Sequence, residues 1–371
     1  MARVGPYVLL VTTSLFATAT LAAQWDDGSR YAFAGSGEEK RVYAFDLKEQ
    51  EAAGQIELDE RPDQVLASDG LAALIVSHRA ARRLTLIDLK DVNLGQIDYA
   101  LDMTPDYINL SPLGDAVAIY DRGNNHLEVH AVKRRAVLLS ADGVDTGGEF
   151  TYSPDGSTLY WLDNATGLLH SIDLWSKRNE LQLARPGQEL SALSRSADGL
   201  LGFVSGVSTN EVFVINLRDL SLLTTVRVPP TPGRPWGTAD GRYMFVAGQS
   251  SNTVSAIATD TLRLTYSVRL DDRPLSIHSG WLDTVAAITG QSGSVVFIDV
   301  DSGKVLEKHQ LEQRPLEAIV TSDSKTMAMP LPGNGELVFF NMRNQAMEKT
   351  LQGLPFDIGE VSIAVSNNLC H

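Results

Sequence analysis

The amino-acid sequence predicts an all-β protein, an eight-bladed β-propeller built from four-stranded antiparallel meanders. Its clearest unit covers residues 244–277, where MFVAG, TVSAIAT and LTYSVRL are apolar or alternating runs separated by the polar stretches QSSN and TD. Short runs with period-two alternation are typical of strands, and residues 244–277 keep no helical spacing for more than one turn. The unit is therefore a β-meander.

The meander recurs along the chain at a nearly constant interval, which is the second observation behind the fold prediction. Consecutive residues that close the corresponding strand are 41 to 43 positions apart. These markers are Asp46, Asp88, Ala131, Asp173, Asn216, Ala258, Asp299 and Asn341. Such a period with about four strands per repeat is typical of propeller blades, which are stable only when stacked between neighbours. Seven blades are the alternative, if the repeat around Asp46 or Ala131 is not a true blade.

The N-terminal residues 1–23 have the pattern of a secretory signal peptide. Arg3 is followed by an apolar stretch over residues 7–16 and by the small residues ATATLAA. The apolar stretch is too short for a comfortable membrane span, and an ordered N-terminal helix is the alternative. We therefore expect one propeller domain over residues 24–371, periplasmic or secreted, without a membrane span.

The two ends of the chain complement each other, which is the third observation. Within a blade four strands are expected, as at residues 150–153, 159–163, 168–174 and 181–183. The first repeat lacks an inner strand, whereas residues 361–365 form a surplus strand after the last repeat. We expect this surplus strand to join residues 31–34 and 42–47 in one blade, because that closes the ring and hides two sheet edges.

Composition restricts the possible partners. The chain has 31 basic and 46 acidic residues, a formal net charge of -15, so a general attraction to nucleic acid is not expected. Cys370 is the only cysteine, which excludes an internal disulfide and a c-type haem motif. We expect a monomer with no bound cofactor, in which Cys370 and His371 form a tail that could also bind metal or link two chains.

One dipeptide recurs where the chain enters successive blades. The Arg-Pro pairs begin at Arg61, Arg185, Arg234, Arg273 and Arg314. Proline suits the start of a strand, and five guanidinium groups around one mouth of the central channel would bind carboxylates or phosphates. Trp236 and His278 lie beside two of these pairs and could add a stacking surface and a titratable group. The alternative is that each arginine pairs with a nearby acid, such as Asp59, Asp271, Asp272 or Glu312.

Three segments carry a resemblance to a known family: MFVAGQSSNTVSAIAT, GFVSGVSTNEVFVINL and AAITGQSGSVVFIDV. They resemble the repeats of the YVTN family of β-propellers, and the likeness extends over essentially the whole chain after residue 23. The resemblance implies a scaffold more than an activity. It suggests an exported, non-catalytic protein that binds an anionic small molecule or a partner protein and assists a periplasmic oxidoreductase or transport system.

Enzyme functions lack their usual motifs. The sequence has no GxSxG elbow, HExxH, P-loop or Rossmann glycine pattern. A propeller enzyme or tetrapyrrole-handling protein that uses His278 or His78 is one alternative, and a d1-type haem would need only an axial histidine and a positive pocket. A surface interaction protein is another. His126 and His130 share one strand face and could bind a metal, although an ordinary exposed strand is the simpler interpretation.

Overall fold

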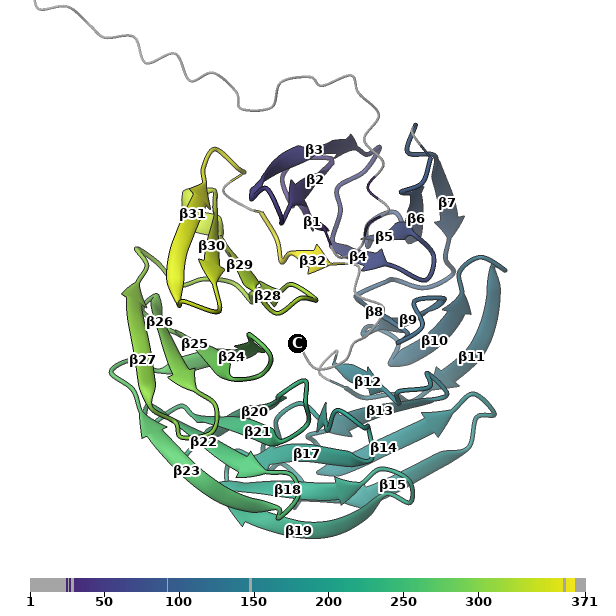
Figure 1. The fold of residues 1–371 in the computed structure, drawn as a ribbon. Helices are drawn as coiled ribbons and strands as arrows, with labels where there is room; N and C mark the ends of the chain where they lie inside the picture. The colour runs from purple at the N-terminus through teal and green to yellow at the C-terminus, as the bar shows by residue number, and fades with distance from the viewer. Residues whose placement is uncertain are drawn as a thin grey trace, which may run out of the picture.

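The computed structural model describes residues 25, 27, 30–91, 93–146, 149–355 and 358–363. In this part of the chain, eight four-stranded antiparallel sheets surround a central axis (Figure 1). The prediction of an eight-bladed propeller is confirmed, and the seven-bladed alternative is wrong. No described helix is long and apolar enough to cross a membrane. Residues 1–23, Cys370 and His371 lie outside the described residues.

Blade 1 contains β32, β1, β2 and β3, and each later blade contains the next four strands in chain order, up to β28–β31 in blade 8. The inner strands are β32 (Ser362–Ile363), β4 (Gln64–Ser68), β8 (Tyr107–Leu110), β12 (Phe150–Tyr152), β16 (Ser194–Arg195), β20 (Pro232–Gly237), β24 (Pro274–Gly280) and β28 (Ile319–Val320). The second strands are β1 (Tyr31–Gly35), β5 (Ala73–His78), β9 (Ala116–Asp121), β13 (Thr158–Asp163), β17 (Leu201–Gly206), β21 (Tyr243–Gly248), β25 (Val285–Gly290) and β29 (Thr326–Leu331). The third strands are β2 (Arg41–Asp46), β6 (Arg83–Asp88), β10 (His126–Ala131), β14 (Leu168–Asp173), β18 (Glu211–Asn216), β22 (Thr253–Ala258), β26 (Ser294–Asp299) and β30 (Glu336–Asn341). The outer strands are β3 (Glu51–Glu57), β7 (Gln96–Ala100), β11 (Ala136–Asp142), β15 (Arg178–Gln182), β19 (Ser221–Arg227), β23 (Arg263–Arg269), β27 (Val305–Gln310) and β31 (Ala346–Leu351). A 3-10 turn, η1 (Pro332–Asn334), connects β29 and β30.

The C-terminal strand closes the ring, as the sequence predicts. β32 pairs with β1 in an antiparallel register that places Ser362 opposite Phe33 and Ile363 opposite Ala32. The Ser362 hydroxyl also accepts a hydrogen bond of 2.9 Å from the backbone N–H of Ala67 in blade 2. β32 therefore links blade 1 to blade 2 while it supplies the missing inner strand of blade 1.

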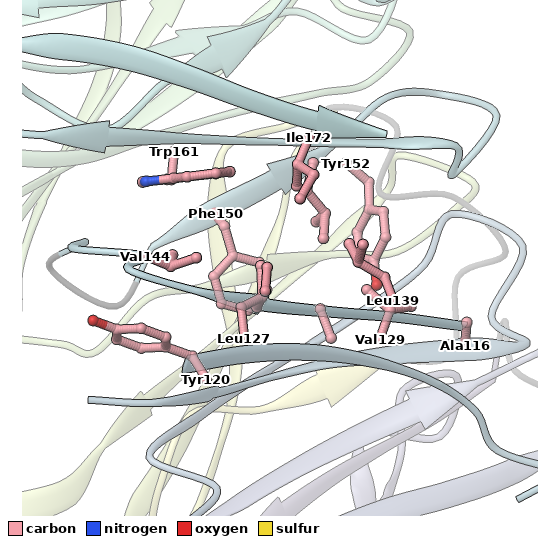
Figure 2. Packing of buried hydrophobic residues seen from close by; sticks show 13 residues of the cluster. Ala116, Tyr120, Leu127, Val129, Leu139, Val144, Phe150, Tyr152, Trp161 and Ile172 are labelled. Carbon is pink, nitrogen blue, oxygen red and sulfur yellow. The ribbon is translucent and has the colours of Figure 1, made fainter. Parts of the chain in front are cut away.

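Hydrophobic side chains fill the space between every pair of neighbouring blades. Eight clusters of buried residues each join two consecutive blades, including one between blades 8 and 1. Figure 2 shows the cluster between blades 3 and 4, where Tyr120 and Leu127 face Phe150, Tyr152 and Trp161. Because each sheet buries both faces in this way, the ring needs no disulfide to hold it together.

A repeated hydroxyl marks the turn after the inner strand and gives a reliable alignment of the blades. In five blades a Ser or Thr hydroxyl accepts a hydrogen bond from the backbone N–H five residues later. These residues are Ser111, Ser153, Ser196, Thr238 and Thr321. In four of them the hydroxyl also donates to an aspartate two residues on. We call this residue the turn hydroxyl, and its side-chain bonds explain why the sequence turns here.

Candidate functional site

A cavity of about 370 Å³ occupies the centre of the ring. All eight inner strands, β32, β4, β8, β12, β16, β20, β24 and β28, contribute to its wall. Ligands of propellers and barrels commonly occupy such central openings, because loops and strands from many repeats converge there. The cavity is therefore the candidate ligand-binding site.

Ionisable side chains gather at one level of this cavity. Tyr107, Glu149, Arg234 and Glu317 all line it, and each lies four residues before the turn hydroxyl of its blade. The residue after each of them is buried, so strand alternation directs the ring residue to the opposite side. Glu360, two residues before β32, does not line the cavity, but its charge affects Tyr107 and Glu317. Arg195 also lines the cavity, one residue before the turn hydroxyl of blade 5. We call Tyr107, Glu149, Arg234, Glu317 and Glu360 the channel ring.

The charges of the channel ring are not neutralised by direct pairing. The described structure shows no ion pair and no side-chain hydrogen bond for Arg234 or for the three glutamates. The Arg234 guanidinium instead stacks on Trp236, 5.2 Å from the ring centroid. The Trp236 Nε1 is shielded from solvent and has no hydrogen-bond partner among the described residues. A cation is thus available at the cavity wall, and an unpaired N–H donor is buried directly beside it.

Burial in the channel raises the pKa values of two residues of the channel ring, Glu317 and Tyr107. The pKa of Glu317 is raised, mainly by burial, with Arg234 opposing and Glu360 and Glu149 reinforcing the shift. Burial also raises the pKa of Tyr107 to about 12. The Glu317 side chain is exposed to the cavity, but protein surrounds the cavity on all sides of the channel. Its carboxyl is therefore accessible and still partly desolvated, which raises its pKa. Perturbed groups in a cleft are typical of functional sites.

Replacing Glu317 by glutamine should raise stability at neutral pH. A carboxyl whose folded pKa exceeds its unfolded value stabilises the fold fully below the unfolded pKa, and this contribution is lost as pH rises through the folded pKa. Glu317→Gln removes that loss, so we expect the free energy of unfolding at neutral pH to rise. The rise should be near the lower end of about 0.5–2 kcal/mol, because cavity water screens the charge. The gain should disappear toward pH 4 in urea unfolding curves. Glu51→Gln, at an exposed position of β3, is the control; an equal gain there, or none at Glu317, would contradict this expectation.

The structure corrects the alignment of the five Arg-Pro pairs. Arg61 and Arg314 precede the inner-strand turn by seven residues, and the register of β24 gives Arg273 the same place. In blade 6 Thr231 holds that place, because Pro232 pairs with Gly248 as Pro274 pairs with Gly290. Arg234 is three residues further into its strand, and Arg185 lies in a longer loop that turns back on Gln188. Of these five arginines, only Arg234 lines the cavity, so the five do not form one ring around it.

The alternative, in which each of these arginines pairs with a neighbouring acid, is not observed either. None of the five has an ion pair in the described part of the chain. Arg273 donates a hydrogen bond of 2.6 Å to the Gln249 side chain, and Arg61, Arg185 and Arg314 are exposed on the face of the ring. Whether any of them binds an anion is still a prediction.

The two histidines proposed as reactive groups both lie away from the cavity wall. His278 is 2% exposed, contacts Trp236 at a ring distance of 5.7 Å, and its Nε2 is 2.9 Å from the Ser276 hydroxyl. His78 is fixed between the Arg61 carbonyl and the Thr85 hydroxyl, and burial lowers its pKa. No described residue of the cavity wall is a histidine, so neither His78 nor His278 is placed there as an axial ligand.

His126 and His130 do share a strand face, as their spacing predicts, but they are joined by hydrogen bonds to protein groups. The Glu128 carboxylate bridges both rings, at 3.2 Å from His126 and 2.7 Å from His130. Asp142 and Tyr99 contact the other ring nitrogens. No cluster of three potential metal ligands occurs among the described residues. The site is best described as a polar contact between blades 2 and 3.

The sequence-based prediction missed four members of the channel ring: Tyr107, Glu149, Glu317 and Glu360. Three of them lie at a fixed distance before the turn hydroxyl, a signal that was present in the sequence. Glu360 had no such marker. It precedes β32 at the C-terminal end of the chain, whereas the other three strands of its blade come from the N-terminal end. Of the predicted residues, the structure brings Arg234 and Trp236 to the cavity.

Comparisons with known proteins agree on the fold. No protein-family model and no curated sequence matches the chain. Among solved structures, the dihydro-heme d1 dehydrogenase NirN in complex with DHE has 14% identity and a TM-score of 0.75, covering 95% of this chain and 79% of that one. Apo AztD from Citrobacter koseri has 12% identity and a TM-score of 0.61, covering 89% of this chain and 96% of that one. Selenomethionine-substituted virginiamycin B lyase from Staphylococcus aureus has 15% identity and a TM-score of 0.54, covering 73% of this chain and 91% of that one.

These similarities define the class of the protein as an eight-bladed β-propeller that resembles those of NirN and AztD. At such low identity they establish the architecture alone, because propellers with unrelated chemistry share it. The closer resemblance to YVTN-repeat proteins is still a prediction.

Proposed function

We propose that this protein is a binding propeller whose central cavity takes a small molecule bearing both an amino or other cationic group and a carboxylate. The observation that carries the proposal is that Glu149, Glu317 and Arg234 line one level of the cavity without an ion pair to one another, in a wall that also contains Arg195. Arg234 would hold the carboxylate of the ligand. Glu317 and Glu149 would hold its cationic group, and the charge of Glu360 would add to their field.

The proposed ligand differs from the purely anionic small molecule that the sequence suggested. An anion alone would meet the Glu149 and Glu317 carboxylates as well as Arg195 and Arg234, so repulsion would offset much of the attraction. A ligand with separated charges of both signs satisfies both parts of the ring. Desolvation of the Glu317 carboxylate, already evident in its raised pKa, would be offset once a cation binds.

The cellular role that we propose is accessory. The N-terminal pattern of residues 1–23 supports export, and the resemblance to YVTN repeats supports a scaffold that assists a periplasmic oxidoreductase or transport system. Similar propellers include proteins described as a dehydrogenase in complex with DHE and as a lyase, which keeps catalysis in the cavity as the alternative. An absorbance spectrum of the native protein tests that alternative, since a bound coloured cofactor would be visible.

Calorimetric titration with three probes of similar length tests the proposed ligand class. L-lysine carries amino groups and a carboxylate, cadaverine is the same skeleton without the carboxylate, and glutarate carries only carboxylates. We expect lysine to bind tightest, cadaverine weaker and glutarate not at all, with binding weakened by salt. Glu317→Gln should weaken lysine and cadaverine together, whereas Arg185→Gln should change neither. Preferential binding of glutarate, or no binding of either amine, would overturn the proposal.

A further inference from the structure

A second surface of interest lies on the outer rim of blades 3, 4 and 5, away from the cavity. It consists of exposed residues at and just after the hairpins between the third and outer strands of these blades. We call this the rim surface, and its members are Lys133, Arg134, Arg135, Val137, Leu138, Trp175, Lys177, Arg178, Arg218, Leu222 and Leu223. The strands that follow these hairpins, β11, β15 and β19, are consecutive along the edge of the ring (Figure 1).

The rim surface differs in charge from the rest of the molecule. In the eight-residue windows that start at the last residue of the third strand, blades 3–5 have six basic and three acidic residues. The same windows of the other five blades have five basic and nine acidic residues, in a chain of net charge -15. The side chains of Lys133, Arg134 and Arg135 make no ion pair in the described structure. Positive charge is thus concentrated in one sector of an acidic protein.

The three acids within these windows are occupied locally. The Asp173 carboxylate accepts hydrogen bonds from the backbone N–H groups of Trp175 and Lys177. Asp219 accepts from the backbone and hydroxyl of Ser221, and Glu180 lies 3.7 Å from His170. They form turns or face their own blade, and the nearby exposed Asp142 carboxylate contacts His126, so the basic side chains of the rim surface are left without an acidic partner among the described residues.

Large apolar side chains protrude from the same sector. Trp175, at the tip of the β14–β15 hairpin, is 81% exposed. Leu138 and Leu223 are the extra residues of β-bulges in β11 and β19, where the register of the outer strand shifts by one. A bulge leaves its extra residue without a partner in the ladder and bends the strand. These side chains therefore extend from convex hairpin tips and strand edges.

The hairpin of blade 4 is held against the far end of the outer strand of blade 3. The Arg178 Nη2 at the start of β15 donates a hydrogen bond of 2.6 Å to the Asp142 carbonyl at the end of β11. This bond fixes the base of the hairpin that carries Trp175 beside the outer strand of blade 3. The protruding tryptophan thus lies near the end of β11, and the basic hairpin of residues 133–135 lies at its start, so β11 connects the two parts of the rim surface.

We propose that the rim surface docks on an anionic lipid bilayer, with the Trp175 side chain inserted at the headgroup level. Exposed Trp and Leu side chains flanked by Lys and Arg are suited to the membrane interface, where the apolar part is buried and the cations meet lipid phosphates. Convex hairpin tips enter a deformable lipid surface, whereas an acidic protein would need a matching concavity. The acidic remainder of the molecule is repelled by anionic lipid, so only the rim surface can approach it.

Flotation with vesicles of phosphatidylglycerol and phosphatidylcholine tests the proposal, with pure phosphatidylcholine vesicles for comparison. The intact protein should bind the mixed vesicles only. Each cation near an anionic surface adds about a factor of 5 to the partition coefficient. The triple variant Lys133→Gln, Arg134→Gln, Arg135→Gln should therefore lower the partition coefficient by about 100-fold. The matched control Lys48→Gln, Arg263→Gln, Lys304→Gln removes the same charge from equivalent hairpins of blades 1, 6 and 7 and should retain at least most of the binding.

Insertion has its own readout, because Trp175 is far more exposed than Trp25, Trp161, Trp236 or Trp281. Brominated lipids should quench tryptophan emission in the intact protein, and Trp175→Ser should abolish the quenching while its melting temperature is unchanged. Equal loss of binding in both triple variants, or quenching that persists in Trp175→Ser, would overturn the proposal. Binding to soluble poly-L-glutamate but to neither vesicle would also overturn it, and would identify the rim surface as a site for acidic proteins.

Discussion

A chain that ends at Glu360 is expected to lose cooperative unfolding and to aggregate. This truncation removes β32, and with it the inner strand of blade 1 and the hydrogen bond from Ala67 to Ser362. It also removes Val361, a buried member of the cluster between blades 8 and 1, whose burial contributes about 1.5–3 kcal/mol. With the ring open, the edge of β1 is free to pair with other chains.

Calorimetry and light scattering measure this loss. The matched control is a chain that ends at Ile363, which keeps β32 and lacks only residues outside the described part. It should melt like the full chain in one transition. If the chain ending at Glu360 melts at the same temperature and with the same cooperativity as this control, β32 does not hold the ring closed.

Arg234→Gln is expected to abolish the ability of the cavity to prefer L-lysine over cadaverine. The two ligands differ only in the carboxylate, and Arg234 is the arginine that stacks on Trp236 at the cavity wall. A hydrogen bond between charged groups is typically worth about 1.5–3 kcal/mol, or roughly 10- to 150-fold in affinity. Lysine should therefore lose that factor in the variant, while cadaverine should bind as well or better because a repulsive cation is gone.

The two ligands and two proteins form a thermodynamic cycle that isolates the contact between Arg234 and the carboxylate. Arg273→Gln serves as the control, because Arg273 bonds to Gln249 on the face of the ring and does not line the cavity. It should leave the lysine-to-cadaverine ratio unchanged. A ratio that responds equally to both substitutions would show that the general field, and not a direct contact, sets the preference.

The architecture could be predicted from the sequence because each blade repeats the same physical pattern. The markers Asp46 to Asn341 all close third strands, and the surplus C-terminal strand has only one sheet edge to complete. Strand boundaries were less certain: the outer strand β15 begins at Arg178, three residues before the predicted start. Its early residues are polar and exposed, so hydrophobic alternation does not reveal them.

The candidate site was predicted less well, for a reason that lies in blade 6. Its inner strand contains both Pro232 and Pro235, and the dipeptide motif selected the second proline although the first one is equivalent to Pro62 and Pro274. A shift of three residues moves a side chain from the entering loop to the channel wall. Glu149 and Glu317 carry no shared dipeptide, so only their distance from the turn hydroxyl marks them in the sequence, and the prediction did not use that distance.

A crystal structure of the protein grown with L-lysine tests the central claim most directly, because it shows where the ligand binds. We predict density for lysine in the central cavity, with its carboxylate against the Arg234 guanidinium and its side-chain ammonium toward Glu317. Lysine bound at the exposed arginines of the ring face, or a cavity that holds only water at saturating lysine, would contradict the account.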